Sequence, residues 1–150
     1  MIHVAVLFAI VLMLFPINRV DAGTDNDTVP NQSASKIRMV FNNQEIIVSM
    51  YDNPASRDFL ALLPLTMEFK DFARTEKIAY LPRRLDTADS PTPRDATGDF
   101  TYYAPWGNLA VFYKGFGTDG QLFVLGRIES GKEKLAVMGD TFTARLEKIE

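Results

Sequence analysis

Two strand-like runs around a Pro-Trp-Gly turn, in residues 98–113, constrain the fold of this chain more than any other feature. The block holds the only tryptophan, Trp106, and its other aromatic residues are Phe100, Tyr102, Tyr103, Phe112 and Tyr113. Bulky aromatic side chains at this density bury a large area and can also line a groove. Because successive side chains of a strand point to opposite faces, Tyr102 and Tyr103 must separate, one inward and one outward. The block therefore predicts a strand pair that contributes both to a core and to an outer face.

Alternating apolar and polar residues predict six further short strands along the chain. The eight strands are expected over residues 37–41, 46–50, 65–70, 76–81, 100–103, 109–113, 122–128 and 142–147. Asn42 and Asn43 separate the first two, and because asparagine tolerates a positive φ they predict a tight hairpin. Gly126 interrupts the seventh strand, where it predicts a bulge or a close backbone approach.

Two short helices are expected beside these strands. Asn53 followed by Pro54 is typical of a helix start, and apolar residues at helical spacing continue until Pro64, which predicts a helix over residues 54–63. Ser130 is positioned to cap a second helix over residues 132–138, which Gly139 would end. The pattern as a whole predicts a mainly β fold, a closed eight-stranded antiparallel β-barrel with two short helices.

The N-terminal part differs from the rest in composition. Residues 4–15 form an unbroken run of twelve apolar residues, and Ala22 ends a stretch typical of a signal-peptide cleavage site. No lysine or arginine precedes the run, and the alternative is an uncleaved anchor, for which the run is short because a spanning helix needs about twenty residues. We expect a signal peptide over 1–22, cleaved after Ala22, a flexible linker over 23–36 and the barrel domain over 37–149. The mature protein is then periplasmic or secreted, without stable membrane insertion.

Composition excludes several classes of chemistry from such a mature protein. The only histidine is His3, inside the predicted signal peptide, and the chain has no cysteine. Ser-His and Cys-His nucleophile pairs and ordinary zinc sites are therefore excluded, and we predict no catalytic residue, metal or cofactor. Cleavage removes Arg19 and Asp21 together, so the net charge stays at −3, which disfavours nucleic-acid binding.

Four patches of the sequence resemble the small bacterial cyclophilin-like proteins. They occur in order over residues 53–64, 69–72, 76–82 and 98–113, and the resemblance covers about residues 37–149. It implies a cyclophilin-like barrel with a binding groove. The motifs of prolyl isomerase cyclophilins are missing: no arginine stands in a Phe-His-Arg context, and the strand after the aromatic turn, Leu109–Tyr113, contains no glutamine. The resemblance therefore implies the fold and a groove, not the isomerase activity.

The candidate ligand-binding residues are aromatic, with one cation beside them. They are Tyr102, Tyr103, Trp106, Phe112 and Arg84. For the aromatic residues the alternative is core packing, and Trp106 in its turn is the one most suited to binding. For Arg84 the alternative is a solvated loop in which Arg83 and Arg94 are balanced by acidic residues. The acidic residues of that loop are Asp86, Asp89, Asp95 and Asp99. Calcium binding by them is disfavoured because their spacing matches no calcium-binding loop.

Two functions remain open from the sequence. The first is a non-catalytic exported module that holds a peptide or small apolar ligand against the aromatic face. The second is a weak peptidyl-prolyl cis-trans isomerase in which Arg83 or Arg84 replaces the missing arginine, which requires one guanidinium in the groove. Whether the protein is an enzyme is left open by the residues alone.

Overall fold

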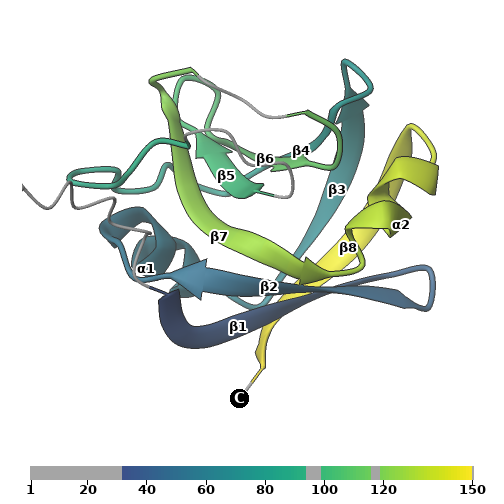
Figure 1. Ribbon diagram of the computed structural model, residues 1–150, viewed down its shortest axis with the longest axis horizontal. Helices are drawn as coiled ribbons and strands as arrows, with labels where there is room; N and C mark the ends of the chain where they lie inside the picture. Colours follow the sequence, from purple (N-terminus) through teal and green to yellow (C-terminus); the bar gives the residue numbers. More distant parts are fainter. Residues whose placement is uncertain (1–31, 94–98, 116–118, 150) are drawn as a thin grey trace, which may run out of the picture.

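The protein is a closed antiparallel barrel, as the alternation of short strands predicts (Figure 1). The computed structural model describes residues 32–93, 99–115 and 119–149. The predicted signal peptide, with its cleavage site at Ala22, lies outside the described residues, as do Arg94 and Asp95. The strands are β1 (Gln32–Phe41), β2 (Gln44–Tyr51), β3 (Leu65–Phe72), β4 (Glu76–Tyr80), β5 (Asp99–Tyr103), β6 (Asn108–Phe112), β7 (Leu122–Ser130) and β8 (Thr141–Ile149). Around the barrel their order is β1-β2-β7-β5-β6-β4-β3-β8.

The first hairpin has the turn that its sequence predicts. Asn42 and Asn43 have φ angles of 46° and 57°, in the left-handed region that asparagine tolerates. β1 begins earlier than expected, at Gln32 within the predicted linker, because Gln32 pairs with Tyr51 of β2. Residues 23–31 of that linker lie outside the described residues.

The first helix, α1 (Pro54–Leu60), begins as predicted and ends earlier than the predicted residue 63. The Asn53 side chain accepts a hydrogen bond from the Ser56 amide at 2.9 Å, which caps the helix. The same side chain donates to the Val124 carbonyl at 2.9 Å, so the cap also anchors α1 on β7. Phe59 is fully buried beneath the helix, with its ring 5.5 Å from that of Phe100.

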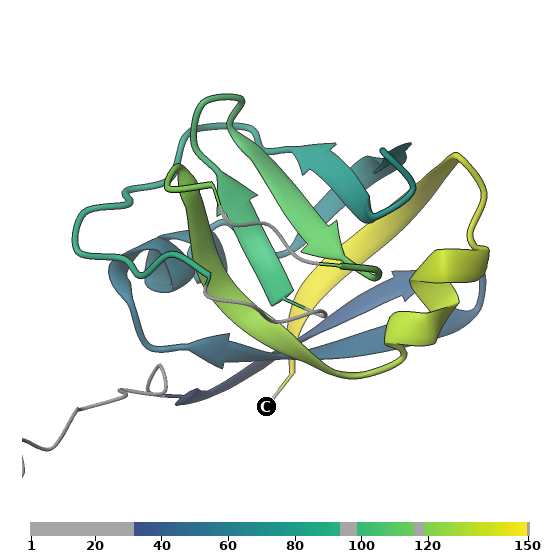
Figure 2. The ribbon, with the colours of Figure 1, turned by 45° about the horizontal axis from the view of Figure 1, so that its top comes forward.

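The second helix, α2 (Lys132–Val137), begins at a different cap from the predicted one. Gly131 takes the N-cap position with φ 86°. Ser130, the predicted cap, is instead the last residue of β7. A Cβ at Gly131 would lie 2.8 Å from the Glu45 carbonyl oxygen, so the close approach of α2 to the first hairpin requires glycine. Figures 1 and 2 show the two helices on opposite sides of the barrel. None of the described helices is long and apolar enough to cross a membrane.

Gly126 of β7 marks a close approach between strands, as predicted. A Cβ at this position would lie 2.5 Å from the Ser49 carbonyl oxygen of β2. On the other side of β7 the register with β5 shifts between Phe100 and Thr101. The glycine therefore lets β2 and β7 pack closely where the barrel wall bends.

The wall formed by β4, β6 and β5 is apolar on both faces. Its inner face joins the barrel core through Ala79, Phe100, Tyr102, Leu109 and Val111. Its outer face carries a separate buried cluster made of Ile78, Ala110, Phe112 and Leu122, against which Tyr103 packs. Strands with this double-sided pattern are expected where both faces are covered. Among the described elements, α1 packs mainly on β7 and α2 mainly on β2, so the outer cluster is left to face a groove.

Candidate binding groove

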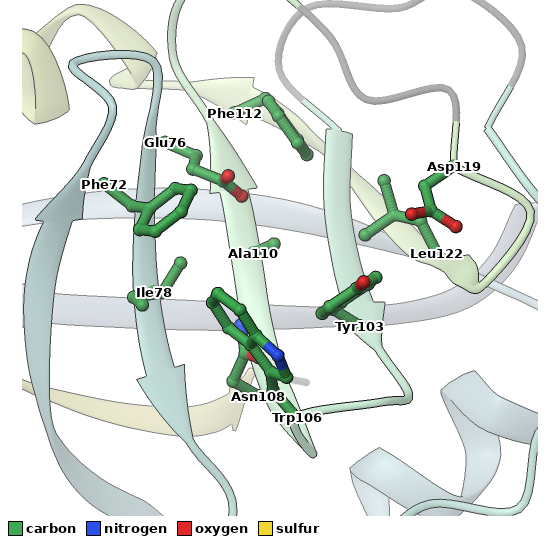
Figure 3. A pocket seen from close by; sticks show the side chains of 10 residues that line it. All are labelled: Phe72, Glu76, Ile78, Tyr103, Trp106, Asn108, Ala110, Phe112, Asp119 and Leu122. Carbon is green, nitrogen blue, oxygen red and sulfur yellow. The ribbon is translucent and has the colours of Figure 1, made fainter.

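A groove of about 320 Å³ lies on the outer face of β4, β6 and β5. Figure 3 shows the side chains that line it: Phe72, Glu76, Ile78, Tyr103, Trp106, Asn108, Ala110, Phe112, Asp119 and Leu122. They come from the three strands and from the turns and strand ends around them. Its volume is at the lower end of the range for small-molecule sites.

The floor of the groove follows from the alternation of side chains in β6. Leu109 and Val111 point into the barrel, whereas Asn108, Ala110 and Phe112 point outward and line the groove. Ala110 pairs with Ile78 of β4 at the centre of this floor. Because the alanine side chain is small, the sheet surface is hollow there while the larger residues around it form the walls.

Exposed aromatic rings form one wall. Trp106 is 49% exposed, and its ring centroid lies 5.5 Å from that of Tyr103 and 5.7 Å from that of Phe72. Both contacts are edge-on, with interplanar angles of 82° and 83°. These neighbours support the indole from two sides and leave much of its surface open to a ligand.

Three hydrogen bonds hold the turn that carries Trp106. Gly107 has φ 70° and its amide donates to the Tyr103 carbonyl at 3.0 Å. The Arg84 guanidinium donates to the carbonyl of Ala104 and, at 3.2 Å, to that of Pro105. Arg84 therefore positions the turn. It was predicted to contact a ligand, but it is not among the residues that line the groove.

Two acceptor groups that line the groove, the Glu76 carboxylate and Asn108 Oδ1, lack a hydrogen-bond partner among the described residues. Burial raises the pKa of Glu76 to about 7, and no described residue donates a hydrogen bond to its carboxylate. Asn108 is 1% exposed; its amide nitrogen donates to the Leu109 carbonyl at 2.8 Å, while its Oδ1 has no partner. Asp119 lies at the exposed rim, where it accepts a hydrogen bond from the Gln121 amide at 2.8 Å.

The structure separates the predicted ligand-binding residues. Tyr103, Trp106 and Phe112 line the groove together. Tyr102, predicted beside them, points into the barrel core, where it is 1% exposed and its hydroxyl accepts a hydrogen bond from the Leu85 amide at 3.3 Å. The reason is the strand alternation itself, which puts the two tyrosines on opposite faces.

Arg83, the other arginine considered for isomerase chemistry, also lies outside the groove. Its guanidinium forms a bidentate contact with Asp58 of α1, at 2.7 and 2.8 Å. This pair, together with the Asp86 amide, lowers the pKa of Asp58 to about 2. Arg83 thus fastens the loop after β4 to α1, and neither Arg83 nor Arg84 presents a guanidinium to the aromatic wall.

Sequence reasoning missed Phe72, Glu76 and Asn108 as groove residues. The sequence holds a weak signal for Glu76: it stands two residues before Ile78 and four before Tyr80, and this spacing places all three side chains on one face of β4. Phe72 and Asn108 stand at strand ends, where periodicity gives no orientation. A nearby acidic residue at the end of β3, Asp71, has a different role: it pairs with the buried Lys77 at 2.7 Å.

A second groove of about 390 Å³ opens between β3 and β4 and shares Ile78 with the first. Pairing of the two strands covers Lys70 to Phe72 on β3 and does not extend to the residues of β3 before Lys70. Beyond this point they diverge, and the exposed Tyr80 lines the opening. The two grooves together offer an elongated surface across β4. Within the described part of the chain, no three acidic, histidine or cysteine side chains gather as a metal site would require.

Comparison with known families finds that the Cyclophilin-like family matches residues 39–147. The chain belongs to the cyclophilin-like family. The solution structure of a hypothetical protein from Archaeoglobus fulgidus is similar to this cyclophilin-like chain, with a TM-score of 0.61 and 17% sequence identity. The similarity covers 79% of this chain and 98% of that one, and at this identity it shows the fold alone. A comparison with curated proteins gives no match.

Proposed function

We propose that this cyclophilin-like protein is a non-catalytic binding module that holds a peptide or a small molecule in the groove around Trp106. The observation that carries the proposal is the groove itself, a hollow over Ala110 walled by exposed aromatic rings. Exposed apolar side chains that gather in one patch are typical of an interaction site, whereas single ones are common on any surface. Of the four in the described part of the chain, Phe72 and Trp106 stand side by side in this groove.

The shape of the surface favours an extended ligand such as a peptide. The second groove continues from the first across Ile78, so a chain that enters beside Trp106 can leave past Tyr80. Apolar walls supply area for binding, and the few polar groups among them supply orientation.

The side chains of the groove support binding without catalysis. Its described lining includes no lysine, arginine, histidine or nucleophilic serine. The two arginines considered for an isomerase reaction, either of which would suffice, form structural contacts instead, Arg83 with Asp58 and Arg84 with the turn backbone. Binding is therefore the function for which the groove is equipped.

Fluorescence of the single tryptophan tests the proposal directly. A panel of short peptides and small apolar molecules is titrated into the protein while Trp106 emission is followed, with calorimetry as a second readout. We expect saturable changes for a subset of the panel. Phe72→Ala should weaken them at least fivefold, whereas Val137→Ala, which truncates an apolar residue 79% exposed on α2, should leave them unchanged. A flat response from both readouts across the panel contradicts the proposal.

We further propose that the module acts outside the cytoplasm. The support is the apolar run at residues 4–15 followed by the small residue Ala22. Expression of the full chain, followed by cell fractionation and mass measurement of the protein, tests it. We expect an extracytoplasmic product that begins at Gly23. A cytoplasmic product that retains Met1–Ala22 contradicts the proposal.

A further inference from the structure

The polar atoms of the groove around Trp106 are nearly all hydrogen-bond acceptors. Glu76 and Asp119 contribute carboxylates and Asn108 contributes Oδ1, whereas the described lining contains no cationic side chain. The donors available are the Trp106 indole and the Tyr103 hydroxyl. A ligand with an anionic group would therefore meet like charge and few donors.

The orientation of the Asn108 amide is determined by its neighbour. Its nitrogen donates to the Leu109 carbonyl, which only accepts, so the oxygen must be the unpartnered end. Asn108 is 1% exposed, and a buried acceptor without a donor is unfavourable. Asn108 and Trp106 both line the groove, and in the view of Figure 3 the indole is drawn in front of the amide. Asn108 is among the residues that line the groove, so an N–H donor on a bound ligand is the partner that this oxygen lacks.

Glu76 also lacks a protein partner. Figure 3 shows its carboxylate pointing into the groove between Phe72 and Phe112. Loss of water around it is what raises its pKa, with no contribution from a neighbouring charge. Lys77, the next residue of β4, points to the other face and pairs with Asp71. Among the described residues no cation pairs with Glu76, so a ligand cation would be its first charged partner.

The aromatic wall suits the same kind of ligand. The exposed face of an indole attracts a cation placed over it, most strongly when water is excluded. Trp106 presents such a surface, and Tyr103 and Phe72 contact it edge-on. A planar or compact cation can therefore rest on the indole while its N–H groups face Glu76 and Asn108.

We propose that this groove recognises an N–H-bearing organic cation, the guanidinium or primary ammonium of a basic peptide side chain. The inference rests on the proposed binding function and adds the chemical class of the ligand. Charge comes from Glu76, the N–H partner is Asn108 Oδ1, and the apolar contact is Trp106. A purely apolar ligand would cover Glu76 and leave Asn108 Oδ1 unpartnered, so it is the poorer occupant.

Four peptides that differ only in the central side chain test the inference. They are acetyl-Ala-X-Ala-amide with X as arginine, lysine, citrulline or norleucine, titrated at pH 8 and low salt by Trp106 fluorescence and calorimetry. Citrulline keeps the shape of arginine but carries no charge and exchanges one guanidinium nitrogen for a carbonyl oxygen, and norleucine is the apolar analogue of lysine. We expect at least one basic peptide to bind tenfold or more tightly than its neutral counterpart.

Variants locate the interaction. Glu76→Gln should reduce the affinity for the basic peptide about tenfold and leave the neutral peptides unaffected. Glu133→Gln, the same change on the exposed face of α2, should alter nothing. Equal affinity for basic and neutral peptides, or no effect of Glu76→Gln, overturns the cation inference while the binding function stands. Failure of all four peptides overturns the cation inference, and the broader ligand panel then decides on the binding function.

Discussion

Glu76 shows how one side chain links the groove to stability. Its pKa rises from 4.5 to about 7 on folding because burial disfavours the charged carboxylate. The folded state therefore binds the proton more tightly than the unfolded state. The resulting stabilisation is present at low pH, and it is lost as the pH rises from about 4.5 to about 7.

We therefore expect wild type to lose stability relative to Glu76→Gln across this pH range. A pKa unit corresponds to about 1.4 kcal/mol, so the difference should reach about 1–3 kcal/mol and then level off above pH 7. Urea unfolding of both proteins between pH 4 and 8 measures it. Parallel curves for the two proteins would mean that Glu76 titrates normally.

Two aromatic residues, Phe59 and Trp106, should differ in their contribution to stability. Phe59 is fully buried under α1, so Phe59→Ala should leave a cavity and cost about 3–5 kcal/mol. Trp106 is 49% exposed in its turn, so Trp106→Ala should cost less, about 1–2 kcal/mol. Urea unfolding followed by far-UV circular dichroism compares them. A larger loss for Trp106→Ala would make the indole a structural element of the barrel and weaken its assignment to binding.

At the scale of the elements, a buried ion pair joins β3, β4 and the end of α2. Lys77 is 1% exposed; its Nζ donates to Asp71 at 2.7 Å and to the carbonyls of Met138 and Gly139 at 3.2 Å. Asp71 also accepts a hydrogen bond from the Tyr113 hydroxyl at 2.7 Å. Loss of the lysine would leave a part-buried carboxylate and two carbonyls without this donor.

Lys77→Ala should therefore destabilise the protein by about 3–5 kcal/mol. Lys70→Ala is the matched control, because Lys70 lies on the neighbouring strand β3, and its ammonium pairs with Glu68 in solvent. Exposed pairs of this kind contribute about 0–1 kcal/mol. Chemical denaturation distinguishes the two variants, and equal losses would show that the buried pair adds nothing beyond a surface one.

The elements were predictable to the extent that local signals define them. Alternation located all eight strands, Asn53-Pro54 located the start of α1, and Asn42-Asn43 located the first turn. The end of α1 and the Gly131 cap of α2 depend on packing against other strands, which the local sequence does not contain. Alternation likewise separates Tyr102 from Tyr103, but which of them faces the core depends on barrel closure.

The groove was predictable in part for the same reason. Trp106 and Phe112 stand out in the sequence as aromatic residues near a turn. Glu76 joins them only because β4 pairs with β6, which places Glu76 opposite Phe112. Arg84 looked equally available for a ligand, and only the fold shows that its donors are used by the turn carbonyls. When the order of strands in the barrel brings two residues together, their separation in the sequence does not predict the contact.

For the whole molecule, one wall of the barrel serves as core on its inner face and as groove on its outer face. Leu109 and Ala110 are neighbours on β6, yet Leu109 is fully buried in the barrel core and Ala110 forms the groove floor. The two functions of the wall should therefore separate by substitution at adjacent positions. This separation is expected because the backbone hydrogen bonds of β6 with β4 and β5 hold both faces in place.

Leu109→Ala should cost about 2–5 kcal/mol through the cavity that it leaves in the barrel, with ligand affinity retained while the protein is folded. Ala110→Leu adds volume at the groove floor, so it should reduce affinity for any ligand of the groove at least tenfold while the far-UV spectrum stays unchanged. Its stability should change by less than that of Leu109→Ala, because the added side chain extends into the groove on the outer face of the wall and not into the barrel core. Unfolding curves and peptide titrations on both variants measure the two effects. If Ala110→Leu binds ligand with normal affinity, the ligand site is elsewhere on the barrel. If Leu109→Ala is as stable as wild type, the inner face of this wall is not part of the core that holds the barrel closed.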